Sequence, residues 1–80
     1  MTSEELSEKV QDIIAASLKL ERGEVRPEVS FKADLDADSL DVIEMALAME
    51  KEFGIRLPDE ALPQIKTVQD AIDYVASHVS

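Results

Sequence analysis

Apolar residues recur at intervals of three or four positions in the N-terminal part of the chain. They are Leu6, Val10, Ile13, Ile14 and Leu18. This spacing places them in one stripe along an amphipathic α-helix. Thr2 and Glu5 are three residues apart and match a capping box, with Ser3 as the competing cap. We therefore predict a first helix over residues 3–19.

A second periodic segment carries apolar residues on two sides. At about 100° per residue, the natural core face collects Val42, Met45, Ala46, Met49 and Phe53. A second stripe contains Leu40, Ile43 and Leu47, interleaved with charged residues. We predict a helix from Ser39 to about Phe53. Either Asp38 or Ser39 could cap it, and Gly54 should stop it.

The second stripe of this helix has two interpretations. An exposed apolar stripe bordered by charge indicates a protein-docking surface. A helix buried on both sides, or aliphatic residues that are singly exposed, would give the same pattern. Because an 80-residue chain with four carboxylates on this helix can hardly bury it fully, we favour the docking surface.

The connection that reaches Asp38 is long for a domain of this size. Gly23, Pro27 and the lack of steady periodicity indicate a loop. Its apolar residues are Val25, Val29, Phe31 and Leu35. Long loops in small domains are usually functional or held in place. We therefore expect these side chains to pack the loop onto the helices.

The rest of the chain predicts one short and one longer helix. Residues 59–62 could form one helical turn, which Pro63 should limit. Thr67 caps a last helix, with Asp70 three residues on. Its predicted buried stripe contains Val68, Ala71, Ile72, Val75 and Val79. The fold class is therefore all-α: a small four-helix bundle with three main helices, one short helix and a long loop between helices 1 and 2.

Length and composition favour a single domain over residues 1–80. The chain has no cysteine, which excludes disulfides, a thiol nucleophile and a cysteine-based metal site. The N-terminus is polar, and no apolar run approaches the length that spans a bilayer. We expect a monomeric, cytoplasmic protein with no membrane segment.

The charge of the chain is strongly negative, with 18 acidic against 8 basic residues and a net charge of −10. Nucleic acid is an unfavourable partner because no cationic stripe is available to neutralise phosphates. The acidic residues crowd into residues 34–52, where Lys51 is the only basic residue. Partners should therefore present basic patches, and association should weaken as salt rises. The same residues could also be a plain solvated helix face.

Ser39 lacks the neighbours of a catalytic serine. A hydrolase elbow needs glycines where this chain has Ala37 and Asp41. The only histidine, His78, lies two residues from a C-terminus that we expect to fray. We therefore predict that the chain is not an enzyme, and that Ser39 is either a plain cap or a cap that carries a group. Unpaired N–H groups and the positive end of the helix dipole would stabilise a phosphate attached there.

The spacing of Asp34, Asp36 and Asp38 imitates the first ligands of a calcium-binding EF-hand loop. The match to this loop fails at its later positions. Ser39 stands where that loop needs glycine, and Met45 stands where it needs glutamate. We predict loose divalent-ion binding by the acidic cluster and no dedicated metal site.

Several stretches of the chain resemble the bacterial, free-standing (type II) acyl carrier proteins. They are Asp34-Leu35, Ala37-Asp38-Ser39-Leu40-Asp41, Glu44, residues 49–53 and residues 67–75. The resemblance implies that Ser39 receives 4′-phosphopantetheine from coenzyme A through a phosphopantetheinyl transferase, and that the prosthetic thiol then holds acyl chains as thioesters. It also implies a surface that docks on basic patches of acyl-processing enzymes. That surface contains Asp38, Leu40, Asp41, Ile43, Glu44, Leu47 and Glu50.

Three positions depart from the pattern of this family. Asp36 stands where the family commonly has glycine, Lys51 stands at a usually acidic position, and Pro63 should shorten the third helix. Three hypotheses remain open at this point. The chain is a carrier in fatty acid or related acyl biosynthesis, a polyketide, peptidyl or D-alanyl carrier, or an unmodified acidic adaptor.

Overall fold

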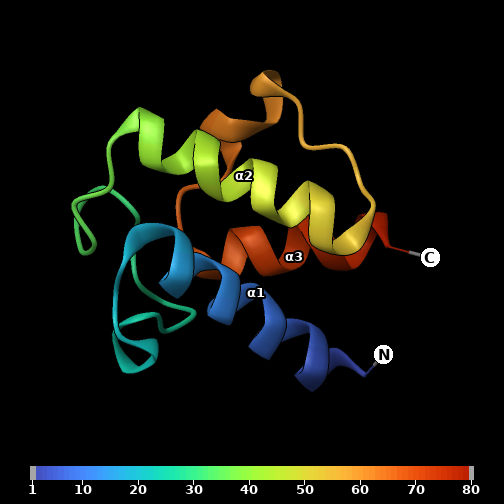
Figure 1. The fold of residues 1–80 in the computed structure, drawn as a ribbon, viewed down its shortest axis with the longest axis horizontal. Coiled ribbons are helices and arrows are strands. Elements are labelled where there is room, and N and C mark those ends of the chain that lie inside the picture. The colour runs from blue at the N-terminus through green and yellow to red at the C-terminus, as the bar shows by residue number, and fades with distance from the viewer. Residues whose placement is uncertain (1, 80) are drawn as a thin grey trace.

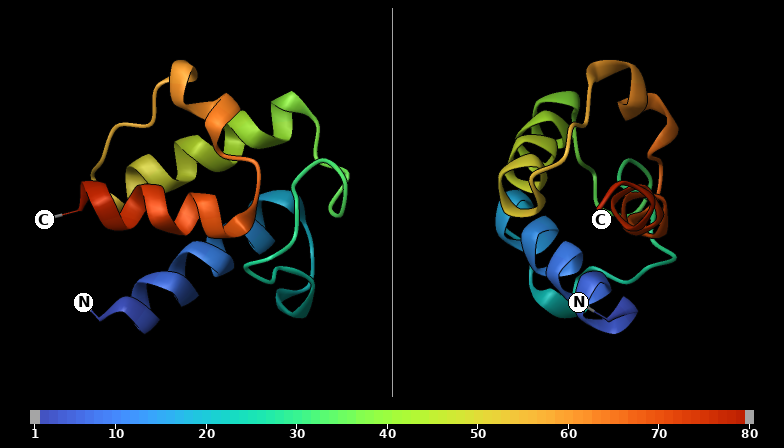
Figure 2. Two further views of the ribbon diagram at one scale, coloured as in Figure 1. Left: turned by 180° about the vertical axis from the view of Figure 1, so that it is seen from behind. Right: turned by 90° about the vertical axis from the view of Figure 1, so that its right-hand side faces the viewer.

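Three α-helices form the body of the protein in the computed structural model, which describes residues 2–79. They are α1 (Ser3–Leu18), α2 (Ser39–Phe53) and α3 (Val68–His78), and α1 packs against both of the others (Figure 1, Figure 2). A 3₁₀ helix, η2 (Asp59–Gln64), lies beside α2. These elements confirm the predicted all-α bundle of three main helices and one short helix. A further turn, η1 (Arg22–Glu24), lies in the long loop and was not predicted.

Capping boxes begin all three α-helices. The reciprocal pairs are Thr2 with Glu5, Asp38 with Asp41, and Thr67 with Asp70. In the first pair, hydrogen bonds from Thr2 lower the pKa of the Glu5 carboxyl group. The structure decides the choice at α2, because Asp38 is the N-cap and Ser39 is the first helical residue. At the other end, α2 stops at Gly54 in the left-handed conformation, as predicted (φ 65°).

The apolar stripes of the three helices form most of the core. Buried residues of these stripes are Leu6, Val10, Ile14, Met45, Ala46, Met49, Val68, Ala71, Ile72 and Val75. Five residues of the predicted stripes are only partly buried: Ile13, Leu18, Val42, Phe53 and Val79. Val42 borders a surface cleft, and Val79 follows the last turn of α3, so neither is fully enclosed. The helical periodicity therefore predicted the core side of each helix correctly.

The long loop is packed onto the helices, as its apolar residues predicted. Val25, Val29 and Phe31 are buried, and Leu35 is partly buried. Backbone hydrogen bonds also join the loop to the segment before α3 and to the first residue of that helix. The Phe31 N–H donates to the Lys66 carbonyl (3.0 Å), and the Val68 N–H donates to the Val29 carbonyl (3.1 Å). The loop is therefore a fixed part of the bundle.

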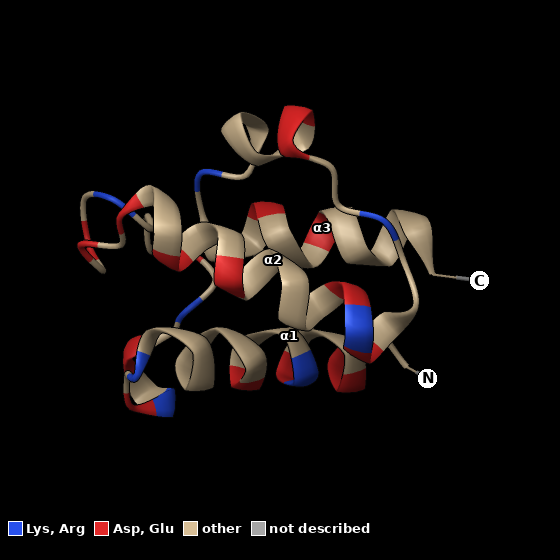
Figure 3. Ribbon diagram, turned by 45° about the horizontal axis from the view of Figure 1, so that its top comes forward, with Lys and Arg blue, Asp and Glu red and all other residues tan. Residues whose placement is uncertain are grey.

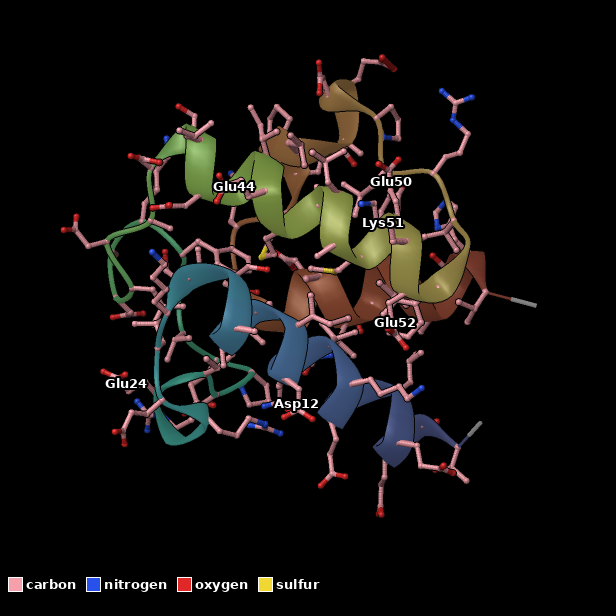
Figure 4. The ribbon with its side chains drawn as sticks, viewed as in Figure 1. Asp12, Glu24, Glu44, Glu50, Lys51 and Glu52 are labelled. Carbon is pink, nitrogen blue, oxygen red and sulfur yellow. The ribbon has the colours of Figure 1, made fainter. Side chains whose placement is uncertain are left out.

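A polar network that the sequence did not reveal holds η1 against α1. Gln11 is only 7% exposed, and its Nε2 donates to the Val25 carbonyl (2.8 Å). The Gln11 Oε1 accepts from Arg22 Nη2 (2.9 Å), and Arg22 Nε donates to Asp12 (2.8 Å). Figure 4 labels Asp12 on α1. A buried glutamine with both ends of its amide satisfied can fix the start of the loop.

The prediction that Pro63 limits the short helical turn was wrong. The helix η2 continues through Pro63 to Gln64. Two backbone hydrogen bonds close its turns. The Ala61 N–H donates to the Pro58 carbonyl (2.9 Å), and the Ile65 N–H donates to the Leu62 carbonyl (3.0 Å). Neither bond uses the nitrogen of Pro63, so the missing N–H does not interrupt the helix.

Candidate functional site

Ser39 stands exposed at the first residue of α2. Within residues 2–79 no side chain or backbone group forms a hydrogen bond with its hydroxyl. The capping box is made instead by its neighbours, since Asp38 Oδ1 accepts from the Asp41 N–H (2.8 Å) and Asp41 Oδ2 accepts from the Asp38 N–H (3.2 Å). Ser39 is therefore not needed as a cap, and its hydroxyl is available at the positive end of a helix.

The outer face of α2 carries the predicted apolar stripe. Leu40 is 64% exposed, Ile43 is 40% exposed and Leu47 is 53% exposed. Glu44 is exposed on the same helix, and acidic positions recur along α2 in Figure 3. Because the three apolar residues are exposed, the alternative of a helix buried on both sides is wrong. An apolar stripe of this kind bordered by carboxylates suits a protein partner.

Glu50 differs from the other acidic residues of α2. It is partly buried, and its Oε2 accepts a hydrogen bond from the Leu57 N–H (2.8 Å). Lys51 beside it is exposed (Figure 4). The Glu50 carboxylate therefore ties the segment after α2 back to the helix. Sequence reasoning missed this contact, because nothing in the spacing marks a carboxylate that bonds seven residues ahead.

A cleft of roughly 520 Å³ opens beside Ser39. Its apolar walls come from α2, η2, the long loop and the segment before α3. They include Phe31, Val42, Ile43, Leu62, Pro63 and Ile65. The sequence could not predict this cleft, because four separate segments form it. An apolar cleft next to an exposed hydroxyl can bind a flexible apolar chain that is attached at that hydroxyl.

Asp36, two residues before the cap of α2, is held in the left-handed conformation (φ 53°). For an L residue this conformation costs about 1–2 kcal/mol, less for aspartate than for most side chains. We expect Asp36→Gly to raise the free energy of unfolding by about 0.5–1 kcal/mol and Asp36→Ala to lower it. Urea denaturation measures both changes.

A control variant separates the backbone effect at Asp36 from the charge effect. Asp36→Asn removes the charge but keeps a side chain that tolerates the left-handed conformation. If asparagine stabilises the protein as much as glycine does, charge repulsion rather than backbone strain explains the result. Equal stability of the glycine and alanine variants would contradict the prediction.

Within residues 2–79, no histidine or carboxylate is hydrogen-bonded to the Ser39 hydroxyl as a catalytic base would be. His78 is exposed at the end of α3, and its ring stacks on Tyr74 with ring centroids 4.0 Å apart. Its Nδ1 lies 2.8 Å from the Tyr74 carbonyl oxygen. His78 is the last residue of α3. The start of α2 and the end of α3 lie at opposite ends of the bundle (Figure 1).

Residues 2–79 show neither a metal site nor a membrane-spanning helix. No group of three or more His, Asp or Glu side chains there is placed to hold a metal ion, including the aspartates that imitate an EF-hand. In the same part of the chain, no helix combines the length and the apolar character needed to cross a membrane.

Residues 8–75 match the family described as "Phosphopantetheine attachment site". Curated relatives named "Acyl carrier protein" align over nearly the full chain. The protein from Cyanidioschyzon merolae is 46% identical over 98% of this chain and 86% of its own length, and the one from Rubrobacter xylanophilus is 46% identical over 98% and 96%. The chain belongs to the acyl carrier protein family.

Two more comparisons agree with this assignment. The acyl carrier protein of Thermosynechococcus vestitus is 45% identical over the whole of this chain and 99% of its own. A solved structure of the acyl carrier protein from Enterococcus faecalis superposes with a TM-score of 0.76, at 42% identity over 96% of this chain and 98% of that one. The fold and the sequence therefore identify the same family.

Membership of the acyl carrier protein family confirms the main functional prediction over its alternatives. The protein is a carrier rather than an enzyme, and it carries 4′-phosphopantetheine covalently. It interacts with acyl chains and with acyl-processing enzymes. The unmodified adaptor and the carriers of other cargo are less well supported.

Proposed function

We propose that Ser39 is the attachment residue, and that the chain shuttles acyl intermediates between enzymes of fatty acid biosynthesis. The observation that carries this proposal is the exposed Ser39 hydroxyl, which no described group engages, at the first residue of α2. A phosphodiester formed there would lie at the positive end of the helix dipole. When bound, the prosthetic group supplies the thiol that holds acyl groups as thioesters.

The surroundings of Ser39 fit such a group. The prosthetic arm needs an exposed starting point, which Ser39 provides, and its acyl cargo needs shelter from water. The apolar walls of the cleft supply that shelter, with Val42 and Ile43 on α2 and Leu62 on η2. The buried Met45 lies one helical turn from Val42 on α2, and the flexible methionine side chain can adapt to cargo of different lengths.

The outer face of α2 is the proposed docking surface for enzymes with basic patches. It consists of Asp38, Leu40, Asp41, Ile43, Glu44 and Leu47, with Glu50 at its edge. We place Glu50 at the edge because one of its carboxylate oxygens already holds Leu57. The exposed apolar residues supply the contact area, and the carboxylates speed the encounter. Such a surface gives fast and weak association, which a shuttle requires.

Modification in vitro tests the proposal. The chain is incubated with coenzyme A and a broad-specificity phosphopantetheinyl transferase, then analysed by intact mass and peptide mapping. We expect one added group, on the peptide that contains Ser39. Loading of the modified chain with malonyl rather than aminoacyl donors would support fatty acid biosynthesis. A group on another residue would overturn the site, and exclusive loading with amino acids would overturn the pathway.

Charge reversal on the docking surface should change the rate of association. Glu44 and Lys51 are both exposed, and their separation of seven residues puts them on one side of α2. At low salt we expect Glu44→Lys to slow association with the transferase roughly threefold to tenfold. Lys51→Glu should accelerate it about twofold or more, since it extends the acidic surface. Stopped-flow mixing at two salt concentrations measures both rates.

A matched control for charge reversal lies on α1. Glu8 is exposed there, and Glu8→Lys changes the net charge by the same amount as Glu44→Lys. We expect a smaller effect from Glu8→Lys, because it lies outside the proposed docking surface. If both variants slow association equally, the total charge rather than the face of α2 guides the partner.

A further inference from the structure

Two lysines line the cleft beside Ser39. Lys32 comes from the long loop, and Lys66 comes from the segment between η2 and α3. Both are exposed. Figure 3 shows basic positions on both of these segments, near the start of α2. The chain has only 8 basic residues against 18 acidic ones, so two lysines at one cleft are an unusual concentration of positive charge.

The backbone holds these two positions together. Ser30 and Thr67 form an antiparallel bridge, and the neighbouring Phe31 N–H donates to the Lys66 carbonyl (3.0 Å). The Lys66 N–H in turn donates to the Asp70 carboxylate (3.0 Å), which belongs to the cap of α3. Lys32 follows Phe31 directly. The backbones of the two lysine segments are thus fixed to each other at one edge of the cleft.

Neither lysine is neutralised by a carboxylate in the part of the chain that the structure describes. The ion pairs found there are Lys9 with Glu52, Arg22 with Asp12, and Arg26 with Glu28. Asp59 also lines the cleft, yet it forms no ion pair with either lysine among these residues. The cleft therefore combines apolar walls with two unpaired cations. This combination suits a ligand that has an anionic group and an apolar extension.

We propose that Lys32 and Lys66 hold the phosphodiester of the prosthetic group and so direct the arm along the cleft. This inference rests on Ser39 as the attachment residue. A phosphodiester on the Ser39 oxygen would lie beside the cleft whatever the cargo is, because Ser39 is one of the residues that line it. Asp38 and Asp41 repel it from the docking surface, while the lysines attract it toward the cleft that they line. A partner with a basic patch then competes with the lysines and releases the arm.

Nuclear magnetic resonance of the modified, unloaded protein tests this proposal. The readouts are the salt dependence of the ³¹P shift and the contacts between the methyl protons of the arm and the side chains of Leu62 and Ile65. We expect the double variant Lys32→Gln/Lys66→Gln to lose most of the salt response of the shift. The arm-to-cleft contacts should weaken about twofold to fivefold, the size of effect that a solvent-exposed ion pair gives.

The matched control is Lys19→Gln/Lys51→Gln, which removes the same charge at two exposed positions outside the cleft. It should behave like the unchanged protein. Circular dichroism should show the same fold for all forms, because all four lysines are exposed.

Three results would overturn the inference. In the first, the cleft variant keeps the salt response and the contacts of the unchanged protein. In the second, the control variant changes as much as the cleft variant. In the third, the lysines matter only after loading with a dicarboxylic acyl group, which would assign them to a carboxylate of the cargo. Peptide mapping precedes each measurement. A group outside Ser39 would refute the proposed attachment site, on which this inference rests, whereas normal modification without a lysine effect refutes this inference alone.

Discussion

Ser39→Ala should give a folded domain that a phosphopantetheinyl transferase leaves entirely unmodified. The loss should be complete, because the hydroxyl is the atom to which the group is joined. Folding should be preserved, because the N-cap is Asp38 and no hydrogen bond of the described structure involves the Ser39 side chain. Alanine is also the better helix former, so the change in unfolding free energy should stay within about 0.5 kcal/mol. Intact mass and a melting curve measure the two effects.

A second serine gives the control for this prediction. Ser30 also lines the cleft, but its hydroxyl accepts a hydrogen bond from the Ala33 N–H (3.2 Å). Ser30→Ala should be modified normally while losing a little stability. Mass gain by the Ser39→Ala chain would show that another residue takes the group. Failure of that chain to fold would show that Ser39 has a structural role that its contacts do not indicate.

Phe31→Ala should have the largest effect on stability among single changes near the site. Phe31 is 2% exposed, and it joins the core to the wall of the cleft. Truncation of a buried phenylalanine costs about 3–5 kcal/mol. A domain of 80 residues has a total stability of about 4–12 kcal/mol. A large part of the stability should therefore be lost, and urea denaturation with a constant m-value measures it.

Phe31→Leu keeps the prediction testable if the alanine variant does not fold. Leucine fills part of the same space, so we expect a loss of about 1–2 kcal/mol. The amide of Ala37, which donates to the Phe31 carbonyl (2.8 Å), should exchange its hydrogen faster in both variants. A loss below about 1 kcal/mol for alanine would contradict the role of Phe31 as the loop anchor.

Local patterns in the sequence predicted most of the fold. The stripe of α1 and its capping box at Thr2 lie within one helix, so spacing alone identified them. The choice between Asp38 and Ser39 as the cap of α2 was beyond the sequence, because both are favoured caps and lie next to each other. Pro63 misled the prediction, because a proline rule for α-helices was applied to a short 3₁₀ helix.

The site was predicted less completely than the fold. The exposed stripe that contains Leu47 could be predicted, since α2 had more apolar residues than one core face needs. The position of Lys32 and Lys66 at the same cleft could not be predicted, because backbone hydrogen bonds between distant segments bring these residues together. The bond from the Leu57 N–H to Glu50 was missed for another reason, because spacing does not mark a carboxylate that accepts a bond from the backbone seven residues ahead. Periodicity reports which side of a helix is buried, and it carries no information on loop-to-loop contacts.

The hydrogen bonds that join the long loop to the C-terminal part of the chain also determine when the surroundings of Ser39 can fold during synthesis. During synthesis, which starts at the N-terminus, Ser39 emerges well before Lys66 and Val68. Until those residues arrive, the Phe31 N–H and the Val29 carbonyl lack the partners that fix the loop. The surroundings of the serine are thus assembled only when the C-terminal part of the chain is present. A transferase that reads these surroundings would therefore act after translation, on the finished domain.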